Sequence, residues 1–247
     1  MDSTNKMVIK KDRIQLFDVD NLGNIYVVNN QQQLVKYNKD LDSVQVYNNV
    51  QLFGQLTSID VSNPLKLILF YKDFSTIVVL DRFLAERSVI DLKKIGIYNA
   101  SAIAVSYDNM IWLYDEMANT IKKINDNGEV ALAYNDFRTL FDNAPYPSKI
   151  MDNNGLNYIY DSQIGLLVMD YYGAYKTTYP ITKAKSINLI NGNIVYIKNN
   201  SLNILQPKAL KDISQPLPKE IANAKKIKID NNTIWYTTDL GLFAYNY

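Results

Sequence analysis

Hydrophobic and polar positions alternate along most of the chain, and the alternation comes in units that repeat about every 40 residues. In each unit an alternating segment leads through an Asn, Asp or Gly turn to a strongly apolar segment with aromatic residues. Alternation with a period of two, and short apolar runs between turns, predict β-strands. The strongly apolar segments lie at 24–28, 67–71, 110–114, 156–160, 194–197 and 233–236.

A third segment, rich in Leu, Ile or Val, follows each of these runs, and a fourth follows it in every unit except the last. Asn, Asp and Gly separate the first and second segments of most units, for example at 20–23 and 152–155. These residues tolerate positive φ, which tight hairpins need. The units are therefore predicted to be antiparallel four-stranded sheets. The third segments lie at 33–38, 76–81, 120–125, 165–170, 201–205 and 241–246.

Four-stranded units at this spacing are typical of the blades of a β-propeller. We predict an all-β fold, a six-bladed β-propeller that forms a single domain over residues 1–247. Because an unpaired sheet edge promotes aggregation, the N-terminal segment is expected to supply the strand that the last blade lacks. The alternatives are a disordered tail for this segment and, for the whole chain, a β-sandwich pair or a linear solenoid. The predicted blades span about 13–49, 56–92, 100–136, 146–181, 184–218, and 224–247 with 6–11.

The composition excludes several classes of catalytic site, metal site and binding partner. The chain has no Cys and no His, which removes thiolate sites, imidazole bases and most zinc sites. With 26 Lys and Arg against 25 Asp and Glu, the net charge is +1, so no nucleic-acid partner is expected. No stretch approaches the roughly 20 apolar residues that span a bilayer, so no direct membrane insertion is expected. The polar N-terminus suggests either a cytoplasmic protein or the mature form of an exported one.

Carboxylates recur where the second strand of a blade joins the third. Asp73, Asp115, Asp161 and Asp239 hold similar places in four predicted blades, and Glu116 follows one of them. These loops share one face of a propeller, where converging carboxylates could bind Ca²⁺. The alternatives are that they cap hairpins or that they recognise a basic partner directly. No cofactor is expected, and the four Asp residues are weak candidates for metal ligands.

The longest irregular segment, residues 136–147, joins the third and fourth predicted blades on that same face. It contains Phe137, Arg138, Phe141 and Tyr146, and Phe53 lies in the corresponding segment between the first and second blades. Aromatic residues and Arg favour protein interfaces, so these five residues are the predicted partner-binding site. The alternative is that the Phe side chains form a small core beneath their own loop.

A second aromatic group lies at a hairpin on the opposite face. It consists of Tyr171, Tyr172 and Tyr175. Exposed aromatic side chains can stack on sugar rings or peptide groups, so this group offers an alternative glycan-binding or peptide-binding function.

The repeat resembles six-bladed β-propellers of the NHL and YncE-like kind over nearly the whole chain. The Tyr-, Asn-, Ile- and Lys-rich texture, as in residues 71–84, is also similar to that of small exported propellers of gliding bacteria with type IX secretion. Among those is a plug subunit that closes the periplasmic end of a translocon barrel. This resemblance implies a periplasmic location, a non-enzymatic role and a larger protein partner, such as an outer-membrane translocon barrel.

The leading hypothesis from the sequence is therefore a rigid propeller that binds a larger protein and has no enzymatic activity. The alternatives are a Ca-dependent hydrolase or lactonase-like enzyme, and a glycan-binding or peptide-binding propeller.

Overall fold

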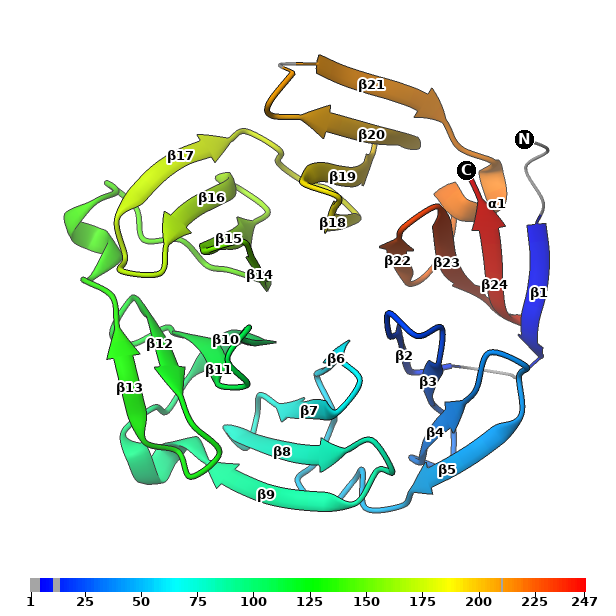
Figure 1. Cartoon of the computed structure of the whole chain (residues 1–247), viewed down its shortest axis with the longest axis horizontal. Helices are drawn as coiled ribbons and strands as arrows, with labels where there is room; N and C mark the ends of the chain where they lie inside the picture. Colours follow the sequence, from blue (N-terminus) through cyan, green and yellow to red (C-terminus); the bar gives the residue numbers. More distant parts are fainter. Residues whose placement is uncertain (1–4, 11–13, 210) are drawn as a thin grey trace.

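The computed structural model shows a ring of six four-stranded sheets around a central axis (Figure 1). It describes residues 5–10, 14–209 and 211–247. Within each sheet the strands pair antiparallel, and the first strand of each blade lies nearest the axis (Figure 1). The predicted all-β, six-bladed β-propeller is confirmed. No helix among the described residues is long and apolar enough to cross a membrane.

The first three blades follow the chain from the axis outward. Blade 1 contains β2 (Leu16–Val19), β3 (Ile25–Val28), β4 (Leu34–Tyr37) and β5 (Ser43–Tyr47). Blade 2 contains β6 (Ser58–Asn63), β7 (Lys66–Tyr71), β8 (Thr76–Asp81) and β9 (Glu86–Asp91). Blade 3 contains β10 (Ala100–Val105), β11 (Ile111–Asp115), β12 (Thr120–Ile124) and β13 (Val130–Ala133).

The remaining blades follow the same order, except that the last one takes its outer strand from the N-terminus. Blade 4 contains β14 (Lys149–Asn153), β15 (Leu156–Asp161), β16 (Gly165–Asp170) and β17 (Tyr175–Tyr179). Blade 5 contains β18 (Ser186–Ile190), β19 (Asn193–Lys198), β20 (Ser201–Gln206) and β21 (Lys211–Pro216). Blade 6 contains β22 (Ile227–Asp230), β23 (Thr233–Thr238), β24 (Gly241–Asn246) and β1 (Asn5–Lys10).

Within the described residues, three short helical turns lie in the connections between blades. They are η1 (Leu92–Ile95), η2 (Phe137–Thr139) and α1 (Lys219–Ala222). Asp91 and Asp136 cap the first two, because their carboxylates accept the backbone N–H groups of Lys93 and Arg138.

Burial explains why the second and third segments are so apolar in the sequence. Blades pack face to face, so their middle strands are covered on both sides, and every residue of β7 is buried. The outer strand faces solvent, and every residue of β21 is exposed. A separate apolar cluster fills each of the six junctions between blades, so the core is a ring of wedges rather than one central mass.

A second set of contacts joins the blades near the axis. At each junction a side chain from one blade makes a hydrogen bond to the inner part of the next. Lys228 and Asp18 complete the ring between blades 6 and 1. The six bonds are Val61 N to Asp18 Oδ2 at 3.2 Å, Val105 N to Asp60 Oδ2 at 2.8 Å, Ser106 Oγ to Asp152 Oδ2 at 3.0 Å, Lys149 Nζ to Ile187 O at 2.6 Å, Asn188 Nδ2 to Ile229 O at 2.8 Å, and Lys228 Nζ to Asp18 Oδ1.

The N-terminal strand closes the ring, as predicted. β1 pairs antiparallel with β24, and the register shifts between Met7 and Ile9. Ile9 is buried in the cluster between blades 6 and 1, together with Val19 and Leu242. The two ends of the chain are thereby held in one sheet (Figure 1).

Candidate functional site

The loops divide between two faces because the strands of each blade are antiparallel. The connection face carries the loops between second and third strands and the segments between blades; the hairpin face carries the other turns. On the connection face, the loop that joins β7 to β8, residues 72–75, contacts several neighbouring loops.

Phe74 and Ser75 link this loop to the segments on either side of blade 2. The Phe74 ring lies directly on Gly54, where an added Cβ would come within 2.6 Å of Phe74 Cε2. Gly54 also has a φ of +82°, so a side chain there would be strained and would displace the ring. On the other side, Ser75 Oγ donates a hydrogen bond to the backbone oxygen of Tyr98.

Lys72 links the same loop to blades 3 and 4. Its Nζ lies 2.8 Å from Glu116 Oε1 and 3.0 Å from the Tyr146 hydroxyl, and 5.0 Å from the centre of the Tyr146 ring. Burial alone would lower the pKa of Lys72, but the hydrogen bonds that it donates to Glu116 and Tyr146 outweigh burial and raise the pKa. Lys72 is therefore charged at neutral pH and holds three loops together.

Six large apolar or aromatic side chains project from these linked loops, and we call them the connection-face patch. They come from five consecutive connections, between β5 and β14. Each is between 45% and 65% exposed, although nearby polar contacts fix their loops. Large exposed apolar side chains on loops that contact one another are candidates for an interaction surface. The patch consists of Leu52, Phe74, Tyr98, Met117, Leu140 and Tyr146.

The five predicted partner-binding residues lie on or beneath this surface. Tyr146 belongs to the patch, and Arg138 is exposed beside it, with its guanidinium on Asp136. Phe137 is fully buried between blades 3 and 4, so in this structure its side chain cannot touch a partner. Phe53 and Phe141 are half-buried: Phe53 packs edge-on against Tyr71, and Phe141 against Phe137. The loop thus forms its own small core and still exposes part of its aromatic surface.

The carboxylates predicted as weak metal candidates do not converge. Asp115 is buried and pairs with Lys122 at 2.6 Å, and Asp239 pairs with Lys225 at the surface. Asp161 is buried and accepts the backbone N–H groups of three residues in its own and the preceding loop. Asp73 is exposed at the rim of a hollow. In the part of the chain that the structure describes, no group of three or more Asp, Glu, His or Cys residues could hold a metal ion.

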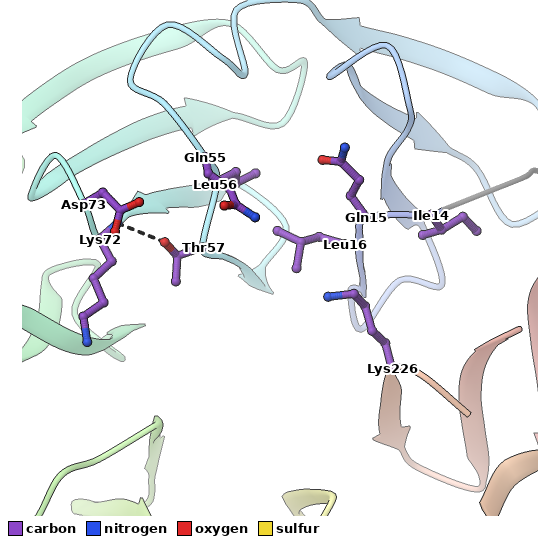
Figure 2. A pocket seen from close by; sticks show the side chains of 9 residues that line it. All are labelled: Ile14, Gln15, Leu16, Gln55, Leu56, Thr57, Lys72, Asp73 and Lys226. Atoms are coloured by element: carbon purple, nitrogen blue, oxygen red, sulfur yellow. Dashed lines mark hydrogen bonds between the residues drawn. The ribbon is translucent and has the colours of Figure 1, made fainter. Parts of the chain in front are cut away.

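That hollow opens on the connection face where blades 1, 2 and 6 meet, and its volume is about 560 Å³. Figure 2 shows Gln55, Leu56 and Thr57 on one wall, with Leu16 opposite and Lys226 extending in from the start of blade 6. It adjoins the patch because Lys72 and Asp73 of the 72–75 loop line its edge.

The sequence prediction named residues of this face but did not include Phe74, Tyr98 and Met117. Phe74 lies in the run 71–84, and Tyr98 and Met117 stand singly in short turns, where one aromatic or Met residue gives no local signal. Only the arrangement of the blades brings them together.

No protein-family model matches the chain, and no curated protein matches it in sequence. Several solved structures are similar in fold. A streptogramin B lyase is 18% identical with a TM-score of 0.65, over 95% of this chain and 79% of the lyase. A virginiamycin B lyase from Staphylococcus aureus is 15% identical with a TM-score of 0.64, over 98% of this chain and 83% of the lyase. That lyase is a catalytically inactive form in which a histidine is replaced by alanine, and it is bound to quinupristin.

A chain of the Mitotic Checkpoint Complex is also similar, at 11% identity and a TM-score of 0.64, over 95% of this chain and 77% of that one. The likeness establishes the propeller. At these identities it shows the fold alone, since propellers carry unrelated functions on one scaffold.

Proposed function

We propose that this propeller is a non-enzymatic binding module and that the connection-face patch is where a larger protein docks. The observation that carries the proposal is the patch itself: large apolar side chains from five consecutive connections, exposed on loops that hold one another in place. A preformed surface on a closed ring loses little conformational entropy on binding, which favours affinity.

The energy available from the patch is enough for a specific contact. Fully burying a large apolar side chain contributes about 1.5–3 kcal/mol, so covering one that is half exposed contributes about 1 kcal/mol. Two or three such anchors at the centre of an interface then account for a roughly 25- to 150-fold change in affinity, at about 1.4 kcal/mol per tenfold.

The lyase chemistry of the similar structures is a poor alternative for this chain. One of those lyases is inactive when a histidine is replaced. This chain contains no His with which to take that role. The fold similarity to a chain of the Mitotic Checkpoint Complex is at least compatible with a propeller that works within an assembly.

The finer proposal is that the partner is an outer-membrane translocon barrel and that the propeller covers its periplasmic opening. It is supported by the resemblance of the sequence to exported propellers of type IX secretion systems and by the closed ring, with a cross-blade bond at every junction. A plug needs a rigid domain with a binding surface on one face, and the connection-face patch is the proposed binding surface.

The test is capture of the partner from the native cell envelope with tagged wild-type protein, quantified against two paired variants. Phe74→Ser with Leu52→Ser removes two patch side chains. Phe83→Ser with Leu65→Ser removes the same residue types, with similar exposure, from the hairpin face of the same blade. We expect the first variant to lose at least tenfold in partner recovery and the second to match the wild type.

Equal loss in both variants, or loss only in the second, would place the interface elsewhere. If a protein other than a membrane barrel shows the patch-dependent binding, the plug proposal fails and the binding proposal stands. Recovery of a barrel that depends on the patch supports both.

A second candidate function, glycan binding, is favoured by one feature of the hairpin face. The rings of Tyr107 and Tyr171 stack at 4.9 Å and are nearly parallel, and Tyr172 beside them is almost fully exposed. Tyr107 is 68% exposed although Tyr171 stacks on its ring and Lys123 Nζ lies 4.9 Å from the ring centre, so part of the ring is accessible to a sugar. A glycan array probed with wild type and Tyr107→Ala tests it; absence of any Tyr107-dependent signal would remove this candidate.

A further inference from the structure

The hollow beside the patch has the features of a binding site for a charged group. Leu16 and Leu56 line it with apolar side chains from opposite sides, and Gln15, Thr57, Asp73 and Lys226 contribute polar groups (Figure 2). It is wide enough for one or two side chains of a partner and lies next to the proposed docking surface.

Lys226 differs from its neighbour Lys225 in having nothing to neutralise it. Lys225 is fully at the surface and pairs with Asp239 at 2.6 Å. The Lys226 side chain is half-buried, and among the described residues it makes neither an ion pair nor a hydrogen bond. Burial, with no carboxylate to offset it, lowers its pKa. A half-buried cation without a partner is unfavourable until an anion reaches it.

The other polar groups favour a side-chain carboxylate over the end of a chain. A terminal carboxylate is usually captured by several free backbone N–H groups. Three of the lining N–H groups are already used: those of Gln15 and Thr57 donate to Val28 and Phe70, and that of Lys72 donates to Thr57 Oγ1 at 3.0 Å. That bond uses the oxygen of the Thr57 hydroxyl as an acceptor and leaves its hydrogen free to donate.

Asp73 sets the orientation of any such ligand. It lies across the hollow from Lys226, exposed, and repels a carboxylate placed at its own end (Figure 2). An acidic side chain therefore fits only toward Lys226, with an apolar neighbour on Leu16 and Leu56.

We propose that this hollow binds an acidic side chain of the docked protein, with Lys226 as its counter-ion and an adjacent apolar side chain packed on Leu16 and Leu56. The inference rests on the proposed function and names the chemistry of the partner segment: an Asp or Glu next to a large apolar residue.

The experiment titrates three acetylated dipeptides into the full-length protein and follows backbone amide chemical shifts by NMR. The probes are acetyl-Leu-Glu-amide, acetyl-Leu-Gln-amide, and acetyl-Gln-Leu with a free terminal carboxylate. We expect the Glu peptide to shift the amides around Leu16, Leu56 and Lys226. The Gln peptide should bind about tenfold more weakly, as for loss of one charge-assisted hydrogen bond.

Lys226→Gln should weaken the Glu peptide about tenfold and leave the unfolding midpoint unchanged, whereas the matched control Lys225→Gln should leave binding unchanged. Equal binding of the Glu and Gln peptides, equal loss in both Lys variants, or no shifts at millimolar peptide would overturn the inference. Tighter binding of the free-carboxylate peptide would overturn the choice of a side-chain carboxylate.

The outcome is separable from that of the proposed function. Met117→Ser with Leu140→Ser, two patch residues whose connections do not line the hollow, should leave peptide binding intact. A negative peptide titration together with patch-dependent partner capture would remove only this inference.

Discussion

Closure of the ring by the N-terminal strand can be measured at a single residue, Ile9. Its side chain is 6% exposed and packs with Val19, Ile25 and Leu242 between the last blade and the first. Ile9→Ala deletes buried methyl and methylene groups and leaves a cavity at the junction. Such substitutions cost about 2–5 kcal/mol, and we expect about 3 kcal/mol because an outer strand relaxes more readily than a central one.

The assay is urea unfolding followed by circular dichroism, with thermal unfolding as a check. For a chain of this size, 3 kcal/mol corresponds to a fall in Tm of about 6–12 °C. The matched control is Met7→Ala in the same strand: Met7 is 43% exposed, so the change should cost about 0.5 kcal/mol. If Ile9→Ala costs no more than Met7→Ala, β1 does not close the ring in solution.

Three further predictions concern stability. Gly165→Ala should destabilise severely, since Gly165 has a φ of +118° and an added Cβ would lie 2.3 Å from a backbone oxygen; Gly155→Ala, at a φ of +82° in open space, should cost only about 1 kcal/mol by thermal unfolding. Asp152→Ala should cost about 2–3 kcal/mol and alter tryptophan fluorescence, because the buried Trp112 Nε1 donates to Asp152 Oδ2 at 2.8 Å. Burial, with repulsion from nearby Lys228, lowers the pKa of Lys149 to about 8, so the folded chain loses this proton at a lower pH than the unfolded chain does. As the pH rises from about 8 to about 10, the free energy of unfolding of the wild type should therefore increase relative to that of Lys149→Met. Urea unfolding of both proteins at the two ends of this range measures the change, and a constant difference would contradict it.

The fold could be predicted from the sequence because the pattern of apolar residues in each repeat follows the burial of each strand. Middle strands that are covered on both faces must be apolar throughout, and tight turns need residues that accept positive φ. Asn109, Asn154, Asn191 and Asn231 all have positive φ in these turns. The prediction that residues 6–11 complete the last blade was available for the same reason, since a missing strand leaves an edge to be paired.

The site was harder to predict because it depends on distances between blades. The loop 136–147 is rich in aromatic residues, but the sequence could not say that Phe137 is buried while Tyr146 is exposed. Phe137 lies in the η2 turn capped by Asp136, whereas Tyr146 contacts Asp161 and Lys72 of other loops. Asp115 and Glu116 are adjacent carboxylates, yet one pairs with Lys122 within its own blade and the other with Lys72 of the neighbouring blade. Pairings of this kind are set by the ring.

The central claim is that the connection face binds a protein, and hydrogen–deuterium exchange of the isolated native complex tests it most directly. Docking on the patch should slow exchange in the connections 48–57, 72–75, 92–99, 116–119 and 134–148 relative to the free propeller, and leave the hairpin turns near Phe83, Tyr107 and Tyr172 unchanged. Protection confined to those hairpin turns, with the connections exchanging as in the free protein, would contradict the account.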